Sequence, residues 1–101
     1  MLNNFRTYQL AVVFFRQAGC IKLPCHLKDQ LARASASIVL NLAEGCGRQT
    51  ASDQRRFFTI AFGSLRECQA VLDLCRTSET EAKECADKLA AHIYKLIKNT
   101  R

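Results

Sequence analysis

The residues best suited to chemistry in this sequence are its six cysteines and two histidines. Cys20, Cys25 and His26 lie close enough along the chain to supply part of a metal site. Their spacing matches no common zinc motif, and a fourth ligand is missing. His26 and His92 are far apart in the sequence and form no HExxH arrangement. We therefore expect neither a metal nor another cofactor.

No catalytic residues can be assigned either, because no Ser-His-Asp or Cys-His arrangement follows from the spacing. Cys68, Cys75 and Cys85 fall on apolar helical stripes, a position typical of small core residues. Cys46 lies between two glycines and is the best candidate for an exposed thiol. The segment 45–47 follows a predicted helix rather than a strand, so it does not resemble a phosphate-binding loop. We expect no enzyme activity, and a redox- or metal-responsive bundle is an alternative hypothesis.

Helices must position these residues, because a chain of 101 residues with one proline and four glycines is poorly suited to a turn-rich β fold. Its length and its 49% hydrophobic content are typical of one folded domain, here residues 1–101. Apolar residues recur with helical spacing in four segments. These segments run from about Asn4 to Gln17, from Pro24 to Gly45, from Thr50 to Thr77, and from Ser78 onward.

Short connections between consecutive helices favour antiparallel neighbours. The predicted fold is therefore all-α, an antiparallel up-down-up-down four-helix bundle. The sequence shows no signal peptide, and its longest apolar run, Leu10–Phe15, is too short to span a membrane. We expect a soluble, cytoplasmic protein with reduced thiols and no membrane partner.

Local signals predict how the helices begin and end. Thr50 can cap the third helix, and a capping-box pattern begins at Ser78. Gly45 is placed to end the second helix in a left-handed conformation. Gly63 and Ser64 lie in mid-helix, where glycine costs about 1 kcal/mol relative to alanine. This cost predicts the close approach of a neighbouring helix there.

Two helices carry more apolar residues than one core stripe needs. The predicted stripes are Phe5, Tyr8, Val12 and Phe15 in the first helix, and Phe57, Ala61, Leu65, Cys68, Leu72 and Cys75 in the third. The residues beside these stripes are Leu10, Val13, Phe14, Phe58 and Phe62. A wide core face would explain them, and so would a second buried surface for self-association. We assign them to a predicted oligomer interface.

The net charge of +6 is concentrated at one end of the predicted bundle. The bases at that end are Arg6, Arg48, Arg55, Arg56, Lys95, Lys98 and Arg101, opposed by Glu44 and Asp53. Acids and bases balance at the other end. Because a concentrated patch attracts phosphates more strongly than scattered charge, the candidate nucleic-acid-binding residues are Arg6, Arg48, Arg55, Arg56, Lys95 and Lys98. An acidic protein surface is the alternative partner.

Two motifs lie at the end of the second helix and in the third. Asn-Leu-Ala-Glu-Gly-x-Gly-Arg occupies residues 41–48, and Arg-Phe-Phe-x-Ile-Ala-x-Gly-Ser-Leu-x-Glu occupies residues 56–67. Glu44 opposes the helix dipole and needs a cationic partner, for which Arg48 and Arg55 are the near candidates. Together with residues 8–11 and 23–38, these motifs resemble the four-helix-bundle family of ribosomal RNA intervening-sequence proteins. The resemblance covers nearly the whole chain.

This resemblance implies a small up-down bundle that assembles as a ring-like homopentamer, and it says nothing of catalysis. Relatives are encoded inside ribosomal RNA insertions, and others are accessory variability proteins of diversity-generating retroelements that bind a reverse transcriptase and its RNA. The positions that match the family motifs are Asn41, Glu44, Gly45, Gly47, Arg48, Gly63, Ser64 and Glu67. The leading hypothesis is a non-enzymatic homo-oligomer that binds RNA or a nucleoprotein, with a protein-only scaffold as the alternative.

Overall fold

The computed structural model describes residues 2–75 and 79–100. Four α-helices account for nearly all of them, and these ranges contain no strand. The helices are α1 (Leu2–Gly19), α2 (Cys25–Cys46), α3 (Ala51–Leu74) and α4 (Thr80–Asn99). The predicted all-α class is confirmed, and the connections are as short as expected.

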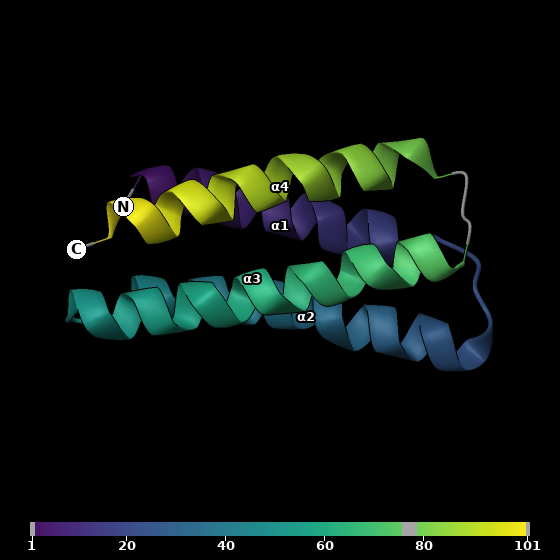
Figure 1. Cartoon of the computed structure of the whole chain (residues 1–101), viewed down its shortest axis with the longest axis horizontal. Coiled ribbons are helices and arrows are strands. Elements are labelled where there is room, and N and C mark those ends of the chain that lie inside the picture. Colours follow the sequence, from purple (N-terminus) through teal and green to yellow (C-terminus); the bar gives the residue numbers. More distant parts are fainter. Residues whose placement is uncertain (1, 76–78, 101) are drawn as a thin grey trace.

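The four helices form an antiparallel bundle, with α1 beside α4 in one layer and α2 beside α3 in the other (Figure 1). Each helix packs against two others, in the order α1, α2, α3, α4 and back to α1. The start of α1, the α2–α3 connection and the end of α4 lie at the same end of the bundle (Figure 1). This arrangement confirms the up-down-up-down topology. The bundle measures 40 × 21 × 17 Å.

The core stripes of α2 and α4 follow the helical spacing closely. Leu31, Ala34, Ile38 and Leu42 are buried along α2, and Ala82, Cys85, Ala86, Leu89 and Ile93 are buried along α4. Leu27 and Leu96 lie at the edges of these stripes and are partly buried against the core. The buried residues of both helices therefore form single stripes with helical spacing.

The predicted inward face of α1 is wrong by about one residue. Phe14 is fully buried together with Ala11 and Ala18, whereas Phe15 is 40% exposed. Apolar residues of α1 lie on most sides of the helix, so helical spacing alone does not determine which side faces the core. The small side chains of Ala11 and Ala18 lie on the same face as Phe14 and leave room for its ring. Phe14 therefore belongs to the core and not to an oligomer interface.

The same correction applies to Phe58 in α3, which is buried in the core, while Phe57 is only half-buried. Gly45 of α2 makes this packing possible. A Cβ atom added at Gly45 would lie 2.5 Å from Cε1 of Phe58, which is closer than packed carbon atoms approach. Of the remaining interface candidates, Leu10 and Phe62 are partly buried against the core and Val13 is exposed.

Gly45 does not end α2 as predicted. The helix continues to Cys46, and Gly47 caps it with a right-handed φ of −87°. Gly63 is also unlike its prediction, because a Cβ atom there would meet nothing within 4 Å. The close helix packing that was predicted at Gly63 therefore occurs at Gly45, and Gly63 faces open space.

Other helix ends follow their local signals. Thr50 is the N-cap of α3, and its hydroxyl accepts a hydrogen bond of 3.1 Å from the Asp53 amide. Glu79 occupies the N-cap position of α4, and Ser78, to which the sequence assigned the capping role, lies outside the described residues. None of the helices, over the part of the chain described, is long and apolar enough to cross a membrane.

The structure places none of the six cysteines in a disulfide. Cys20 and Cys25, on either side of the α1–α2 connection, are the exposed ones, whereas Cys46 is partly buried. The expectation for Cys46 was wrong because α2 extends past Gly45 and keeps this residue against the core. Cys68 is fully buried, and burial raises its pKa to about 12. Burial also raises the pKa of Cys85.

Candidate nucleic-acid interface

The predicted cations gather where four helix ends meet. Arg6 lies near the start of α1, Arg48 just after α2, Arg55 and Arg56 near the start of α3, and Lys95 and Lys98 near the end of α4. These segments share one end of the bundle (Figure 1). We call this set the basic pole. Arg101, which the sequence placed there as well, lies outside the described residues.

Arg48 is held in place by two contacts. Its Nη2 atom lies 2.9 Å from Oε2 of Glu44, one helical turn earlier. Its guanidinium group also lies over the ring of Phe57, 4.7 Å from the centroid. Arg48 is therefore the compensating partner that Glu44 needs at the end of α2. These contacts limit the conformations of the arginine before any ligand arrives.

The Phe57 ring contacts a second arginine. The guanidinium group of Arg56 lies 4.5 Å from the centroid of the same ring, and its Nε atom is 3.8 Å from Oδ1 of Asp53. Two planar cations, one from the connection after α2 and one from α3, thus converge on one aromatic side chain. Such groups present several N–H donors in a fixed geometry, which suits them to phosphate oxygens.

Arg55 makes a different contact. Its Nη1 atom donates a hydrogen bond of 2.7 Å to the carbonyl oxygen of Thr100, just beyond α4. The last carbonyl groups of a helix have no partner within the helix, so this bond satisfies one of them. Arg55 therefore connects the start of α3 to the end of α4, in addition to contributing charge.

Arg6 and Lys95 line the same groove between α1 and α4. The groove has a volume of about 440 Å³. Its lining residues are Arg6, Thr7, Ala91, His92, Lys95, Leu96 and Asn99. Sequence reasoning did not connect His92 and Asn99 to this site. Their spacing of i−3 and i+4 from Lys95 places all three on one helical face, a signal that could have identified them.

A second group of aromatic and basic residues lies between α3 and α4. The rings of Phe62 and Tyr94 are 6.4 Å apart and tilted by 47°. Arg66 lies 4.9 Å from the Phe62 centroid, and Lys98 lies 5.6 Å from the Tyr94 centroid. Phe62 was predicted to lie in an oligomer interface, and its contacts with Tyr94 and Arg66 were not predicted. Each cation follows its ring by four residues, a spacing that indicates contact on a helix.

The motif positions of α2 and α3 lie along their shared face. Ser64 Oγ is 2.9 Å from Ser37 Oγ, and Asn41 Nδ2 donates hydrogen bonds of 2.9 Å to the Ser37 carbonyl and 3.1 Å to its hydroxyl. Gln30 Nε2 donates to Oε2 of Glu67 at 3.1 Å. These side chains satisfy one another, so this part of the motif connects the two helices.

The cysteine and histidine candidates do not form a comparable cluster. Over the described residues, no group of three or more His, Cys, Asp and Glu side chains could hold a metal ion. The structure therefore brings the predicted basic residues together at one end of the bundle, while Cys20, Cys25 and His26 do not become part of such a group.

One family model, described as 23S rRNA-intervening sequence protein, matches residues 6–101 of the chain. No match was found among curated proteins, and none among solved structures.

Proposed function

The chain belongs to the 23S rRNA-intervening sequence protein family, and from that premise we propose that it is a non-enzymatic, homo-oligomeric subunit that binds RNA. The observation that supports RNA binding best is the convergence of Arg48 and Arg56 on Phe57. Ordering a long arginine side chain costs conformational entropy on binding. The Phe57 ring and the carboxylates of Glu44 and Asp53 already restrict the two arginines, so less conformational entropy is lost when RNA binds.

The charge of the basic pole supports the same proposal. Glu44 and Asp53 each lie beside an arginine, but Arg6, Lys95 and Lys98 add positive charge from α1 and α4. Fields from several cations add over the surface and attract a polyanion before contact. A ligand with closely spaced phosphates fits such a surface better than a single small anion does.

Self-association is the second part of the proposal, and it is supported by exposed apolar residues on the α2–α3 face. Leu40 is 66% exposed, and Ile60 is also exposed. Both lie within one helical turn of the Ser37–Ser64 hydrogen bond, beside the open position at Gly63. Exposed apolar residues of this kind can pack against another copy. We propose a pentamer, the assembly that the resemblance implies.

Sedimentation analysis tests the assembly. Leu40→Glu should lower the sedimenting mass, because a charge cannot be buried in an apolar interface without a partner. Leu74→Glu is the matched control, since Leu74 is 73% exposed at the opposite end of α3. An unchanged mass for Leu40→Glu would remove this face from the proposal.

RNA binding is tested by filter binding of a structured RNA across a salt series. Arg48→Gln combined with Arg56→Gln removes two cations from the basic pole, and Lys22→Gln combined with Lys88→Gln removes two exposed cations from elsewhere. The first pair should weaken binding at least tenfold. It should also reduce the slope of log K against log salt by about 1.4 to 1.8 if both side chains contact phosphates.

Phe57→Leu separates charge from geometry, because it keeps both arginines and removes the ring that orients them. It should weaken binding less than the double arginine variant and leave the salt slope nearly unchanged. Salt-independent binding, or equal effects of the two double variants, would contradict the proposal. A partner captured equally well after nuclease treatment would instead favour the protein-only scaffold, whereas capture lost on treatment would favour a nucleoprotein such as a reverse transcriptase with its RNA.

A further inference from the structure

Side chains of α3 and α4 pair at regular intervals along the line where the two helices meet, which we call the α3–α4 seam. Arg55 reaches Thr100, the Phe62 ring contacts Tyr94, and Gln69 Nε2 donates to Oδ1 of Asp87 at 3.1 Å. Seven residues separate successive members of the series on α3, which corresponds to about 10 Å along the helix. Phe62 therefore lies one step from Arg55 of the basic pole, near the middle of α3.

Tyr94 is unusually accessible for a ring held in a fixed contact. It is 55% exposed, whereas its partner Phe62 is partly buried against the core. The preceding turn of α4 carries Ala90 and Ala91, whose side chains are too short to cover the ring. One side of the aromatic pair is thus anchored to the core, and the other faces solvent.

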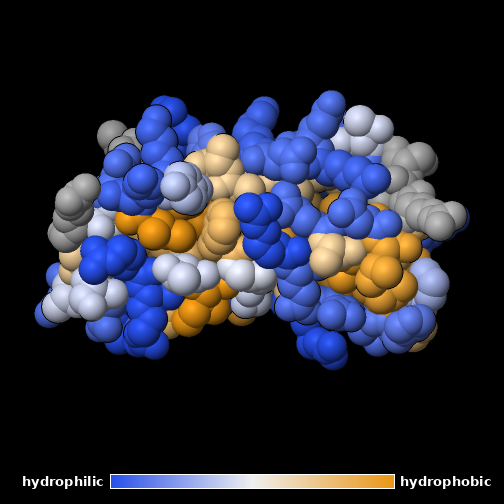
Figure 2. All heavy atoms as spheres, in the orientation of Figure 1, coloured by the Kyte–Doolittle hydropathy of each residue, from blue (hydrophilic) through white to orange (hydrophobic). Residues whose placement is uncertain are grey.

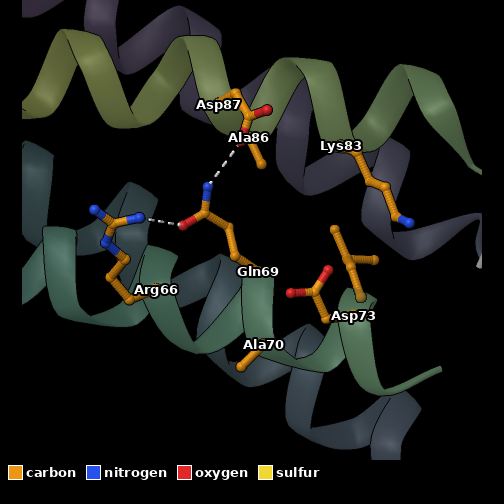
Figure 3. Close-up of a pocket in the computed structure, with 8 residues that line it drawn as sticks. Arg66, Gln69, Ala70, Asp73, Lys83, Ala86 and Asp87 are labelled. Carbon is orange, nitrogen blue, oxygen red and sulfur yellow. Dashed lines mark hydrogen bonds between the residues drawn. The ribbon is translucent and has the colours of Figure 1, made fainter. Parts of the chain in front are cut away.

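Cations flank the pair on both helices. Lys98 follows Tyr94 by one turn toward the basic pole, and Arg66 follows Phe62 by one turn away from it. Arg66 is itself held by a hydrogen bond of 3.1 Å from Nη1 to Oε1 of Gln69 (Figure 3). The order along the seam is therefore cation, ring, ring, cation.

Beyond Arg66, polar and charged side chains replace the aromatic rings along the seam. A groove of about 440 Å³ continues between α3 and α4, lined by Gln69, Asp73, Lys83 and Asp87 among others (Figure 3). Its two carboxylates offset the cations Arg66 and Lys83, so a phosphate chain gains less there than at the basic pole. In the space-filling view, apolar atoms are visible at two places along the seam, separated by hydrophilic side chains (Figure 2). A bound polyanion would therefore extend from the basic pole to Arg66 and no further.

We propose that Tyr94 and Phe62 form a stacking platform for an unpaired RNA base, with Lys98 and Arg66 contacting the phosphates on either side. This inference rests on the proposed RNA binding and makes it more specific, because a base inside a duplex cannot reach the platform. Aromatic side chains flanked by cations are the usual means of holding single strands without reading their sequence. An exposed cation–ring contact is weak, so Lys98 can exchange the ring for a phosphate.

A second protein copy is the competing occupant of the ring surface. Lys98 and Arg66 flank the rings, and neither makes an ion pair among the described residues. Burying them against an identical surface would bring like charges together, at a desolvation cost. A nucleotide supplies both a flat ring and a negative charge, so it complements the whole cluster.

The test compares a single-stranded RNA octamer with a duplex RNA of the same length. Tyr94→Leu keeps an apolar side chain but removes the stacking surface, and it should lower the affinity for the single strand about tenfold. Its effect on the duplex should be less than twofold. Tyr94→Phe should restore the parent affinity, and Phe15→Leu, which removes another exposed ring outside the platform, is the control.

Fluorescence gives an independent measurement, because the chain has two tyrosines and no tryptophan. In a Tyr8→Phe background Tyr94 is the sole tyrosine, and its emission should fall when the octamer binds and should not change with inorganic phosphate. Equal losses for duplex and single strand, or parent affinity in Tyr94→Leu, would overturn the platform. A reduced sedimenting mass in Tyr94→Leu with unchanged RNA affinity would assign the ring to a contact between copies.

The outcomes also separate this inference from the proposed function. If Arg48→Gln with Arg56→Gln weakens binding of structured RNA while Tyr94→Leu changes nothing, only the platform fails. If the protein binds neither RNA in a salt-dependent way, the proposed function fails and the platform fails with it.

Discussion

Helix α3 has two seams that are built from different kinds of residue. On the α2 side, Gly45 lets the Phe58 ring approach the backbone of α2, and the Ser37 and Ser64 hydroxyls meet directly at 2.9 Å. On the α4 side, long side chains such as Gln69 cross the gap, and a groove of about 440 Å³ lies between the helices. Small residues close one seam, and long polar residues leave the other open.

This difference separates packing from ligand binding. In the α2–α3 seam the polar groups of Ser37, Asn41 and Ser64 bond to one another, so little hydrogen-bonding capacity is left for a ligand. In the α3–α4 seam, Arg66 and Lys98 make exposed contacts that a phosphate can replace at low cost. We infer that the motif residues shared by α2 and α3 mainly specify how the subunit folds and packs.

The largest expected effect comes from disturbing the closed seam. Gly45→Val should lower the free energy of unfolding by about 2 to 3 kcal/mol, because the new side chain overlaps the buried Phe58 ring. Urea unfolding followed by circular dichroism measures this change. In a Phe58→Leu background the additional cost of Gly45→Val should shrink, since part of the ring is gone. A cost below about 0.5 kcal/mol in the parent background would show that the seam opens easily.

A second prediction asks whether water enters the core through the open seam. Burial raises the pKa of Cys68 from 9.0 to about 12, so the unfolded chain loses its proton first as the pH rises. Stability should therefore fall between pH 9 and pH 12, by about 1.4 kcal/mol per pH unit from this thiol.

The measurement is the pH dependence of urea unfolding, compared between the parent and Cys68→Ala. The variant should lose this part of the alkaline slope. Val71→Ala, which truncates another buried residue of α3 without removing an ionisable group, should keep the parent slope. Equal slopes in the parent and Cys68→Ala would mean that solvent reaches the thiol, and that the α3–α4 groove extends into the core.

The third prediction concerns Gly45, which lies in the α2–α3 seam, and Gly63, which faces open space. Gly63→Ala should raise the free energy of unfolding by about 0.5 to 1 kcal/mol, because alanine favours the helix and its Cβ meets nothing within 4 Å. Gly45→Ala should have the opposite sign. Thermal unfolding at several protein concentrations measures both. A loss of stability in Gly63→Ala that grows with concentration would place the Gly63 backbone against another copy.

Sequence reasoning predicted the four helices and their antiparallel order because helical spacing and local end signals depend on nearby residues only. Thr50 as a cap and Arg48 as the partner of Glu44 are confirmed for the same reason. Helical spacing did not predict which of two neighbouring aromatic residues is buried, as at Phe57 and Phe58. Both lie within a wide apolar arc, and the choice depends on Gly45 in another helix.

The candidate site was also predictable only in part. The gathering of basic residues at one end follows from topology and from which helix ends carry them. The pairing of Phe62 with Tyr94 requires the register between α3 and α4, which no local pattern contains. The His92 groove likewise depends on how α1 packs against α4. Contacts within a helix were therefore predictable, and contacts between helices were not.

The smallest effect is the coupling across each seam, and it is the most direct test of the comparison. A double-mutant cycle on Ser37→Ala and Ser64→Ala should give a coupling energy of about 0.5 to 1 kcal/mol, because the partly buried hydroxyls lose a hydrogen bond with little access to water. The matching cycle on Gln69→Ala and Asp87→Ala should give less than about 0.5 kcal/mol, since water replaces that exposed bond. Urea unfolding of all four single and both double variants supplies the values. Asn41 also donates to the Ser37 hydroxyl, so Ser37→Ala should cost more than Ser64→Ala. If the two cycles gave equal couplings, the seams would be energetically alike, and the division between a packing face and a binding face would have to rest on charge alone.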